Sequence, residues 1–223
     1  MINVAIDGPS GAGKSSLAKS IAAKMGYIYV DTGALYRAIG LYAYEHGVDP
    51  EDSEKIIALL PDIKLSLRYI DGTQSVILCG KDVSQEIRLP HVSMLASGVS
   101  KIPEVREFLL DLQRDMAKKH DVIMDGRDIG TVILPDADVK IFLTASVEGR
   151  AKRRYKELVE KGVETSYNDV LEDMRRRDLQ DASREVAPAV PAPDAVFLDN
   201  TELDLEATVN KVVDIINKTV GEK

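Results

Sequence analysis

The residues best suited to chemistry lie near the N-terminus, where residues 8–15 fit the pattern G-x-x-x-x-G-K-[ST]. Glycines in such a loop let backbone N–H groups turn toward one anion, and a following helix adds the positive end of its dipole. Lys14 can reach the β- and γ-phosphates of a nucleoside triphosphate, and the Ser15 hydroxyl can ligate Mg²⁺. The loop therefore predicts nucleotide binding by Gly8, Pro9, Ser10, Gly11, Ala12, Gly13, Lys14 and Ser15.

The flanks of this loop have the secondary structure that a phosphate-binding loop requires. Residues 2–6 form a short apolar run rich in β-branched side chains, which is typical of a buried strand. After the loop, apolar residues recur at the spacing of one helix face, namely Leu17, Ala18, Ile21, Ala22 and Met25. A chance match to the four fixed letters is expected in roughly one chain in a hundred of this length. The strand and helix make chance a poor explanation.

Strand and helix patterns alternate along most of the 223 residues, which predicts an α/β fold with a parallel sheet covered on both faces. The strands are expected at 2–7, 27–31, 121–125, 138–143 and 195–199. A last helix is expected at about 205–219. Residues 187–193 contain three prolines and should form an extended link into the last strand.

One stretch departs from this alternation. Residues 64–69 and 74–78 alternate polar and apolar side chains around Asp71-Gly72, which predicts a β-hairpin. We interpret it as a small antiparallel insert between two helical regions, with an extra edge hairpin on the main sheet as the alternative.

Composition excludes several classes of protein. The net charge of −8 argues against a general nucleic-acid binder, and no run of eighteen apolar residues is present to span a membrane. The single cysteine, Cys79, excludes an internal disulfide and fits a reducing cytoplasm; we expect it to be a small strand residue. His46, His91 and His120 lack the spacing of zinc ligands. A strand beginning at residue 2 leaves no room for a signal peptide. No exposed apolar stripe demands a dimer, so we expect a monomer.

The second strand ends in Asp31-Thr32-Gly33, at the sheet edge where ligands of open α/β sheets gather. We expect Thr32 to cap the next helix, which carries Tyr36 and Arg37 in its first turns. The alternative is a plain helix cap with a solvated arginine.

Further charged groups follow later strands. The segment 125–128, Asp-Gly-Arg-Asp, ends the third strand, and its charge density exceeds what a surface turn needs. Arg177, Asp181 and Arg184 have the spacing of one helix face. A preceding helix carries Arg150, Arg153 and Arg154, and residues 161–166 form a Gly-containing turn between the two helices.

These two arginine-bearing helices have two interpretations. Either stripe alone is typical of a solvated ion-pair face. Two stripes in a chain with a phosphate-binding loop indicate a lid that closes over phosphates. Phosphoryl transfer to a phosphate needs positioning and positive charge and no general base, because the attacking oxygen is already anionic. Arginines suit this role through two-point contacts to phosphate.

Together, four segments resemble the bacterial cytidylate kinase family: residues 6–15, 31–37, 125–132 and 177–181. The resemblance runs from residue 2 to about 220. It implies a P-loop NTPase fold with a five-stranded parallel core (1–31, 101–151 and 169–223). It also implies a monophosphate-binding subdomain with the antiparallel insert at about 32–100 and a short lid at about 152–168. The expected reaction is direct in-line transfer of the γ-phosphoryl group from ATP, with Mg²⁺, to CMP and dCMP.

The resemblance also implies roles for individual residues. ATP binding extends to Ser16, and Lys14, Arg127, Arg153 and Arg154 are the expected catalytic residues. The expected base-reading residues are Ser97, Arg106 and Asp128. The acceptor phosphate is expected on Arg37, Arg127 and Arg184, and the sugar on Arg177 and Asp181. Asp31, Thr32 and Tyr36 are expected to bind the substrate as well. Ser15 would ligate Mg²⁺, with water and phosphate oxygens completing the shell.

Two other functions compete with this one. A UMP kinase or a shikimate-type kinase of the same fold is the nearer alternative, although the hairpin insert and the Arg177, Asp181 and Arg184 set argue against the shikimate type. A nucleotide-switched binding protein of the GTPase type would need N-K-x-D after an apolar strand. Neither Asn-Lys pair fits this pattern: Asn210-Lys211 is followed by Val212-Val213 and Asn217-Lys218 by Thr219-Val220, both in the last predicted helix, so we reject that function.

Overall fold

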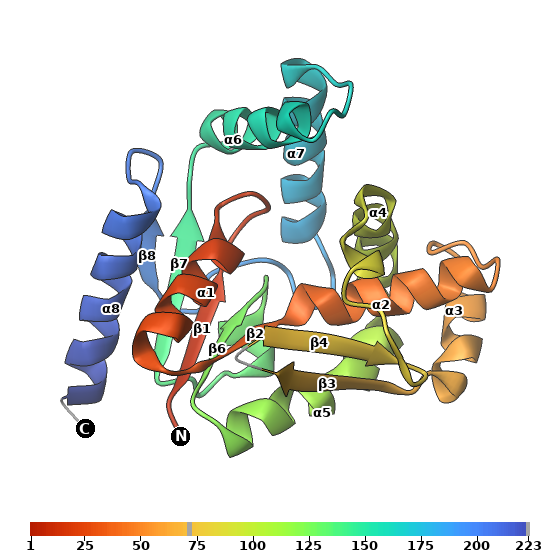
Figure 1. The fold of residues 1–223 in the computed structure, drawn as a ribbon, viewed down its shortest axis with the longest axis horizontal. Coiled ribbons are helices and arrows are strands. Elements are labelled where there is room, and N and C mark those ends of the chain that lie inside the picture. The colour runs from red at the N-terminus through yellow and green to blue at the C-terminus, as the bar shows by residue number, and fades with distance from the viewer. Residues whose placement is uncertain (71–72, 222–223) are drawn as a thin grey trace. The chain divides into compact units, whose positions relative to one another are not determined.

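The computed structural model describes residues 1–70 and 73–221 and confirms the predicted α/β fold (Figure 1). The first half of the chain forms β1 (Asn3–Asp7), α1 (Lys14–Met25), β2 (Ile28–Asp31), α2 (Thr32–Glu45), α3 (Ser53–Leu59), η1 (Leu60–Asp62), β3 (Leu65–Ile70), β4 (Thr73–Leu78), β5 (Lys81–Asp82), η2 (Glu86–Arg88), α4 (Pro90–Val99) and α5 (Pro103–Lys119). The second half forms β6 (Val122–Asp125), η3 (Ile129–Ile133), β7 (Val139–Thr144), α6 (Val147–Glu160), α7 (Tyr167–Ala182), β8 (Val196–Asp199) and α8 (Leu205–Gly221).

The main sheet has five strands in the order β2-β6-β1-β7-β8. The pairs β1–β7 and β7–β8 are parallel, with Val4 opposite Val139 and Ile141 opposite Val196. Each strand begins within one residue of its predicted start. The link 187–193 contains neither helix nor strand, as predicted, although Ala187 takes a left-handed backbone (φ 52°) rather than an extended one.

The chain divides into two compact units, which we describe separately. The first comprises Met1 and Ile28–Val122, so the predicted monophosphate-binding segment 32–100 lies inside it. Its core is a hydrophobic cluster in which α2 packs against α4, around Leu35, Ile39 and Val92. Its small sheet, β3-β4-β5, is antiparallel and separate from the main sheet, which confirms the insert. The predicted turn Asp71-Gly72 lies outside the described residues.

The second unit comprises Ile2–Tyr27 and residues from Ile123 onward. In it, α1 packs against α8, and α8 packs against β7 (Figure 1). The helices α6 and α7 pack on each other through Ala151, Val170 and Met174. The turn between these helices, residues 161–166, falls where the sequence predicted it.

Three local predictions were wrong. The cap of α2 is Asp31, whose Oδ1 accepts a hydrogen bond from the Ala34 N–H at 3.0 Å, and Thr32 is the first helical residue. Arg184 does not lie on a helix face with Arg177 and Asp181, because α7 ends at Ala182. Cys79 lies just after β4 in a turn, exposed and with a φ of 49°, because the chain reverses there toward β5.

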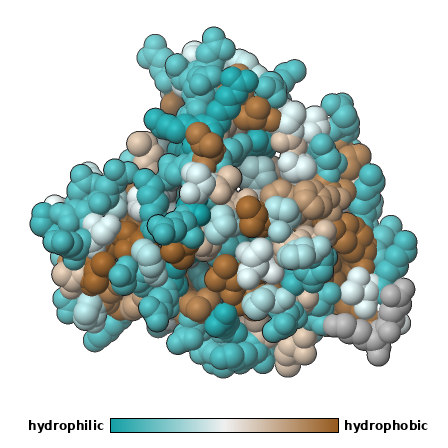
Figure 2. Space-filling model, turned by 180° about the vertical axis from the view of Figure 1, so that it is seen from behind, coloured by the Kyte–Doolittle hydropathy of each residue, from teal (hydrophilic) through white to brown (hydrophobic). Residues whose placement is uncertain are grey.

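Large exposed hydrophobic side chains come from many elements, including Tyr44, Met94, Val159, Leu179 and Phe197. On the face shown in Figure 2, hydrophobic residues lie mostly in small groups among hydrophilic ones. Among residues 1–70 and 73–221, no helix combines the length and hydropathy needed to cross a membrane. The monomeric state stays a prediction.

Candidate active site

The glycine loop connects β1 to α1 with a backbone that ordinary residues rarely adopt. Gly8 has a φ of 146°, and a Cβ built there would lie 1.9 Å from the carbonyl oxygen of Leu143 on β7. Gly11 and Gly13 also have positive φ values, 72° and 89°. The loop therefore depends on glycine for both its curvature and its close approach to β7.

The N-terminus of α1 is left open to an anion. Gly13 occupies the cap position, and it has no side chain to accept hydrogen bonds from the first N–H groups of the helix. These N–H groups and the positive end of the helix dipole are suited to an anion, which agrees with the site that the sequence predicts.

Lys14 is almost fully buried, with 6% of its surface exposed, and its Nζ donates a hydrogen bond to the Pro9 carbonyl at 2.8 Å. Burial, with the nearby charge of Arg127, lowers the pKa of Lys14 from 10.5 to about 7, although Asp125, Asp7 and Asp181 oppose that shift. The negative charge of a bound phosphate would favour the protonated form of Lys14 and so raise its pKa.

Asp7, which the sequence analysis did not select as a site residue, anchors the segment after β6. Its carboxylate accepts hydrogen bonds from the N–H groups of Ile129 and Gly130, each at 2.8 Å. Burial raises the pKa of Asp7 to about 6 against the opposing effect of these two bonds. The strand-end position of Asp7 was the available signal, but its partners lie over 120 residues away in sequence.

Ser15 lies at the start of α1, and its hydroxyl donates a hydrogen bond to Oδ2 of Asp125 at 2.7 Å. Asp125 is the last residue of β6 and is buried. The pair places an exposed hydroxyl oxygen and a carboxylate side by side at the glycine loop. Oxygen donors of this kind fit Mg²⁺.

Arg127, Asp181 and Arg184 form one cluster. The Nε of Arg127 donates to Oδ2 of Asp181 at 2.7 Å, and Arg184 pairs with Oδ1 of the same carboxylate. Arg177, predicted to act beside Asp181, instead pairs with Asp173 at 2.9 Å. The structure thus brings together three of the five predicted substrate-binding residues of this unit. Of the other two, Arg177 pairs elsewhere, and Asp128, next to Arg127 in sequence, is buried.

The arginines of α6 have different surroundings. Arg153 donates to the Asn200 carbonyl at 2.8 Å, and Arg154 pairs with Glu157 at 2.8 Å. Arg150 is buried, so the prediction that it lies with Arg153 and Arg154 on an exposed arginine face was wrong. It donates to the carbonyl of Ser10 in the glycine loop at 2.8 Å and to Asp178 at 2.6 Å.

Sequence reasoning missed Asn200 as a second support of the loop. Its Nδ2 donates to the Ala12 carbonyl at 3.0 Å, and its side chain is buried. Asn200 follows β8 directly, at the same edge of the sheet as the glycine loop. That strand-end position is the signal that could have identified it.

In the first unit, Asp31 and Arg37 form an ion pair at 2.7 Å. Within the described chain, the buried Nε of Arg37 has no hydrogen-bond partner. The guanidinium of Arg106 lies over the ring of the nearly buried Tyr36, 5.4 Å from its centroid. Arg106 also donates to the Ser100 carbonyl at 3.1 Å, and Ser97 lies one turn earlier, near the end of α4.

These features define a P-loop nucleotide-binding protein: a glycine loop, a helix with an open N-terminus and a buried lysine lie at the carboxyl edge of a parallel five-stranded sheet. A shikimate kinase from Bacteroides thetaiotaomicron shares this fold, with a TM-score of 0.50 at 11% identity over 97% of this chain and 98% of that one. An uncharacterized protein from Eubacterium ventriosum gives 0.51 at 12% identity over 97% and 99%. At such identities the likeness concerns the fold alone.

The chain belongs to the cytidylate kinase family, whose family model matches residues 4–218. It is 51% identical over 222 residues to the cytidylate kinase of Caldicellulosiruptor saccharolyticus, covering 100% of this chain and 98% of that one. It is 49% identical over 218 residues to the cytidylate kinase of Lactobacillus johnsonii, covering 98% and 95%. The family membership removes the shikimate-type kinase and the GTPase-type switch from consideration.

Proposed function

We propose that this chain is a cytidylate kinase that transfers the γ-phosphoryl group of ATP directly, in line, to CMP and dCMP, forming CDP and dCDP. The observation that carries this proposal is the open N-terminus of α1 beside the buried Lys14, in a chain of the cytidylate kinase family. ATP binds through residues 8–16, whose backbone N–H groups and Lys14 contact the phosphates.

Mg²⁺ is the metal that fits the donors at the loop. Ser15 would ligate it, and Asp125 would hold the Ser15 hydroxyl in place through the bond at 2.7 Å. When bound, the ion neutralises charge on the β- and γ-phosphates.

The acceptor phosphate needs positive charge and orientation. In the first unit, Arg37 is suited to it, because the buried Nε–H of Arg37 lacks an acceptor that a phosphate oxygen would supply. Asp31, which pairs with Arg37, and Thr32 and Tyr36 at the start of α2 bind the substrate beside it. In the second unit, Arg127 and Arg184 have the same role, and Asp181 holds both in place.

The nucleoside is recognised by other groups. Ser97, Arg106 and Asp128 read the cytosine, where a buried carboxylate and a guanidinium match the polar edge of the base. Arg177 and Asp181 bind the sugar. For Arg177, this requires release from its pair with Asp173.

Residues 152–168 act as the lid, because α6 and α7 with their connecting turn carry arginines that can approach the transferred group. Arg153 and Arg154 are the catalytic candidates there, since their present partners are a loop carbonyl and a half-buried glutamate. A cytoplasmic location and a monomeric state complete the proposal.

A panel of acceptors tests the function. The purified chain is given ATP and Mg²⁺ with CMP, dCMP, UMP or shikimate, and ADP release is measured. We expect turnover with CMP and dCMP and a much lower kcat/KM with UMP. The proposal would be contradicted if UMP were turned over as well as CMP, or if only UMP or shikimate were turned over.

A further inference from the structure

The side chain of Gln74, on β4 of the antiparallel insert, contacts the main chain of Asp31, the residue that caps α2. Its Oε1 accepts a hydrogen bond from the backbone N–H of Asp31 at 2.9 Å, and its Nε2 donates to the carbonyl of Asp31 at 3.3 Å. One amide group therefore holds the main chain of Asp31 on both sides of its Cα.

The orientation of this amide is set by the neighbouring strand. Tyr69 lies directly opposite Gln74 in the β3–β4 register, and its hydroxyl donates to Oε1 at 3.2 Å. Burial and the charge of Asp31 raise the pKa of Tyr69, so this hydroxyl keeps its proton and stays a donor. A flipped amide would place its NH₂ group against the Asp31 N–H and its oxygen against the Asp31 carbonyl, which disfavours that state.

Asp31 in turn orients Arg37. One carboxylate oxygen caps α2 at Ala34, and the other pairs with Arg37 at 2.7 Å. Gly33 leaves room for this arrangement, because a Cβ there would lie 3.2 Å from a guanidinium nitrogen of Arg37. The main chain of Asp31 therefore determines where its carboxylate, and hence the guanidinium, can lie.

We propose that Gln74 is a positioning residue that fixes Arg37 for the acceptor phosphate by clamping the backbone of Asp31. The proposal rests on the proposed role of Arg37. A residue acting this way contributes equally to the ground state and the transition state, so its loss raises the acceptor KM and leaves kcat nearly unchanged.

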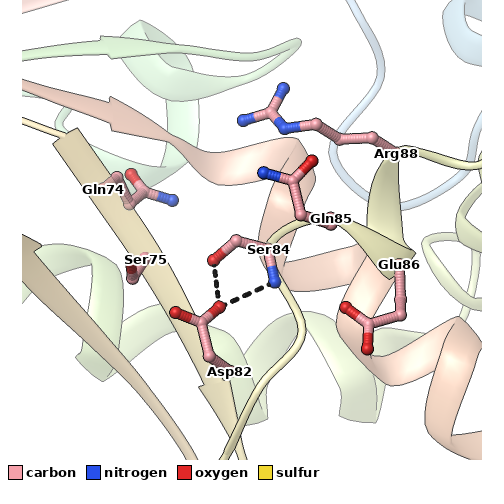
Figure 3. Close-up of a pocket in the computed structure, with 7 residues that line it drawn as sticks. All are labelled: Gln74, Ser75, Asp82, Ser84, Gln85, Glu86 and Arg88. Atoms are coloured by element: carbon pink, nitrogen blue, oxygen red, sulfur yellow. Dashed lines mark hydrogen bonds between the residues drawn. The ribbon is translucent and has the colours of Figure 1, made fainter.

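Gln74 is open to substitution without damage to the core. It lines a surface pocket of about 310 Å³ together with Ser75, Asp82, Ser84, Gln85, Glu86 and Arg88 (Figure 3). In that pocket, Ser84 donates to Asp82 from both its backbone and its hydroxyl. Ser75 faces Asp82 and serves as the matched control, since it neighbours Gln74 on the same strand.

The test compares Gln74→Met with Ser75→Ala. We expect Gln74→Met to raise the KM for CMP by about 5- to 20-fold, the effect of losing two neutral hydrogen bonds. The KM for ATP and kcat should change less than twofold, and Ser75→Ala should leave all three unchanged. If Gln74→Met fails to fold, Tyr69→Phe, which removes only the hydroxyl, should raise the acceptor KM in the same direction by a smaller factor.

A double-mutant cycle with Arg37→Ala separates positioning from general destabilisation. In the Arg37→Ala background, Gln74→Met should have no further effect on the acceptor KM, because the group that it positions is gone. An equal effect in both backgrounds, or a rise in the ATP KM of the same size, would overturn the positioning role. If Arg37→Ala itself leaves the acceptor KM unchanged, the role of Arg37 is wrong. If Arg37→Ala raises it and Gln74→Met does not, only the inference about Gln74 fails.

Discussion

Arg127 and Asp181, 54 residues apart in sequence, form an ion pair in which Nε lies 2.7 Å from Oδ2, while Arg184 pairs with the other carboxylate oxygen. One buried carboxylate thereby holds two arginines beside each other. Without it, the two like charges would repel each other in a partly buried site. The pairing makes Asp181 a support for the two arginines proposed to bind the acceptor phosphate, as well as a candidate ligand of the sugar.

Asp181→Ala should lower kcat/KM with both CMP and dCMP, and more strongly with CMP, because only CMP offers a 2′-hydroxyl. A lost charge-assisted hydrogen bond corresponds to about 1.5–3 kcal/mol, or about 10- to 150-fold in kcat/KM. Arg184→Ala should reduce both acceptors alike. Equal losses with CMP and dCMP in the Asp181 variant would remove Asp181 from sugar binding and leave only its support of the arginines.

Lys14→Met should abolish turnover while the protein stays folded. The buried ammonium group has a lowered pKa, so it is held at a cost in solvation, and its removal should not lower the melting temperature. Steady-state kinetics and thermal unfolding in the same buffer measure the two effects. Activity near that of the unchanged protein would refute the phosphate-binding role of the loop.

Asp7 should titrate with a midpoint near pH 6, two units above an ordinary aspartate, because burial outweighs its two backbone hydrogen bonds. Since its folded-state pKa is raised, the native state binds more protons than the unfolded state between about pH 4 and pH 6. Its contribution to the free energy of unfolding therefore decreases as pH rises through this window and is constant above it.

Carbon-13 NMR of the aspartate carboxyl groups measures this midpoint, with Asp7→Asn assigning the signal. A midpoint near pH 4, the ordinary value, would mean that the hydrogen bonds from Ile129 and Gly130 fully offset burial.

Gly8→Ala should destabilise the protein far more than Gly26→Ala. Both glycines have positive φ, but only at Gly8 would the added Cβ meet a backbone atom, the Leu143 oxygen at 1.9 Å, whereas the space around Gly26 is open. Left-handed backbone alone costs about 1–2 kcal/mol in a non-glycine residue, which sets the expected effect at Gly26. Chemical denaturation of both variants provides the comparison, and similar losses would exclude the steric explanation.

Asp128→Ala and Arg106→Ala should weaken the preference for cytosine. A pocket that pairs with the polar edge of a base rejects analogues because mismatched groups remain unpaired away from water. The measurement is the ratio of kcat/KM for CMP to that for UMP. An unchanged ratio in a variant that keeps its overall activity would contradict base reading by that residue.

The sequence by itself determined part of the secondary structure and the glycine loop. The strands of the main sheet, the antiparallel insert and the helix at Lys14–Met25 follow from local periodicity, since apolar spacing and glycine position act within a few residues. The same locality allowed the glycine loop to be identified from its letters and flanks. The capping residue of α2 was predicted wrongly because Asp31 and Thr32 are both good caps. The choice between them depends on the geometry at the end of β2.

Only the tertiary structure decided which charged groups meet. Arg150 looked like a surface arginine from its helical spacing, yet it is buried against Ser10 and Asp178. Asn200 reaches the loop at Ala12 across 188 residues of sequence. The lowered pKa of Lys14 likewise depends on burial by distant elements. Spacing along one helix or strand determines which side chains share a face, but the partner of that face is set by chain folding over long separations.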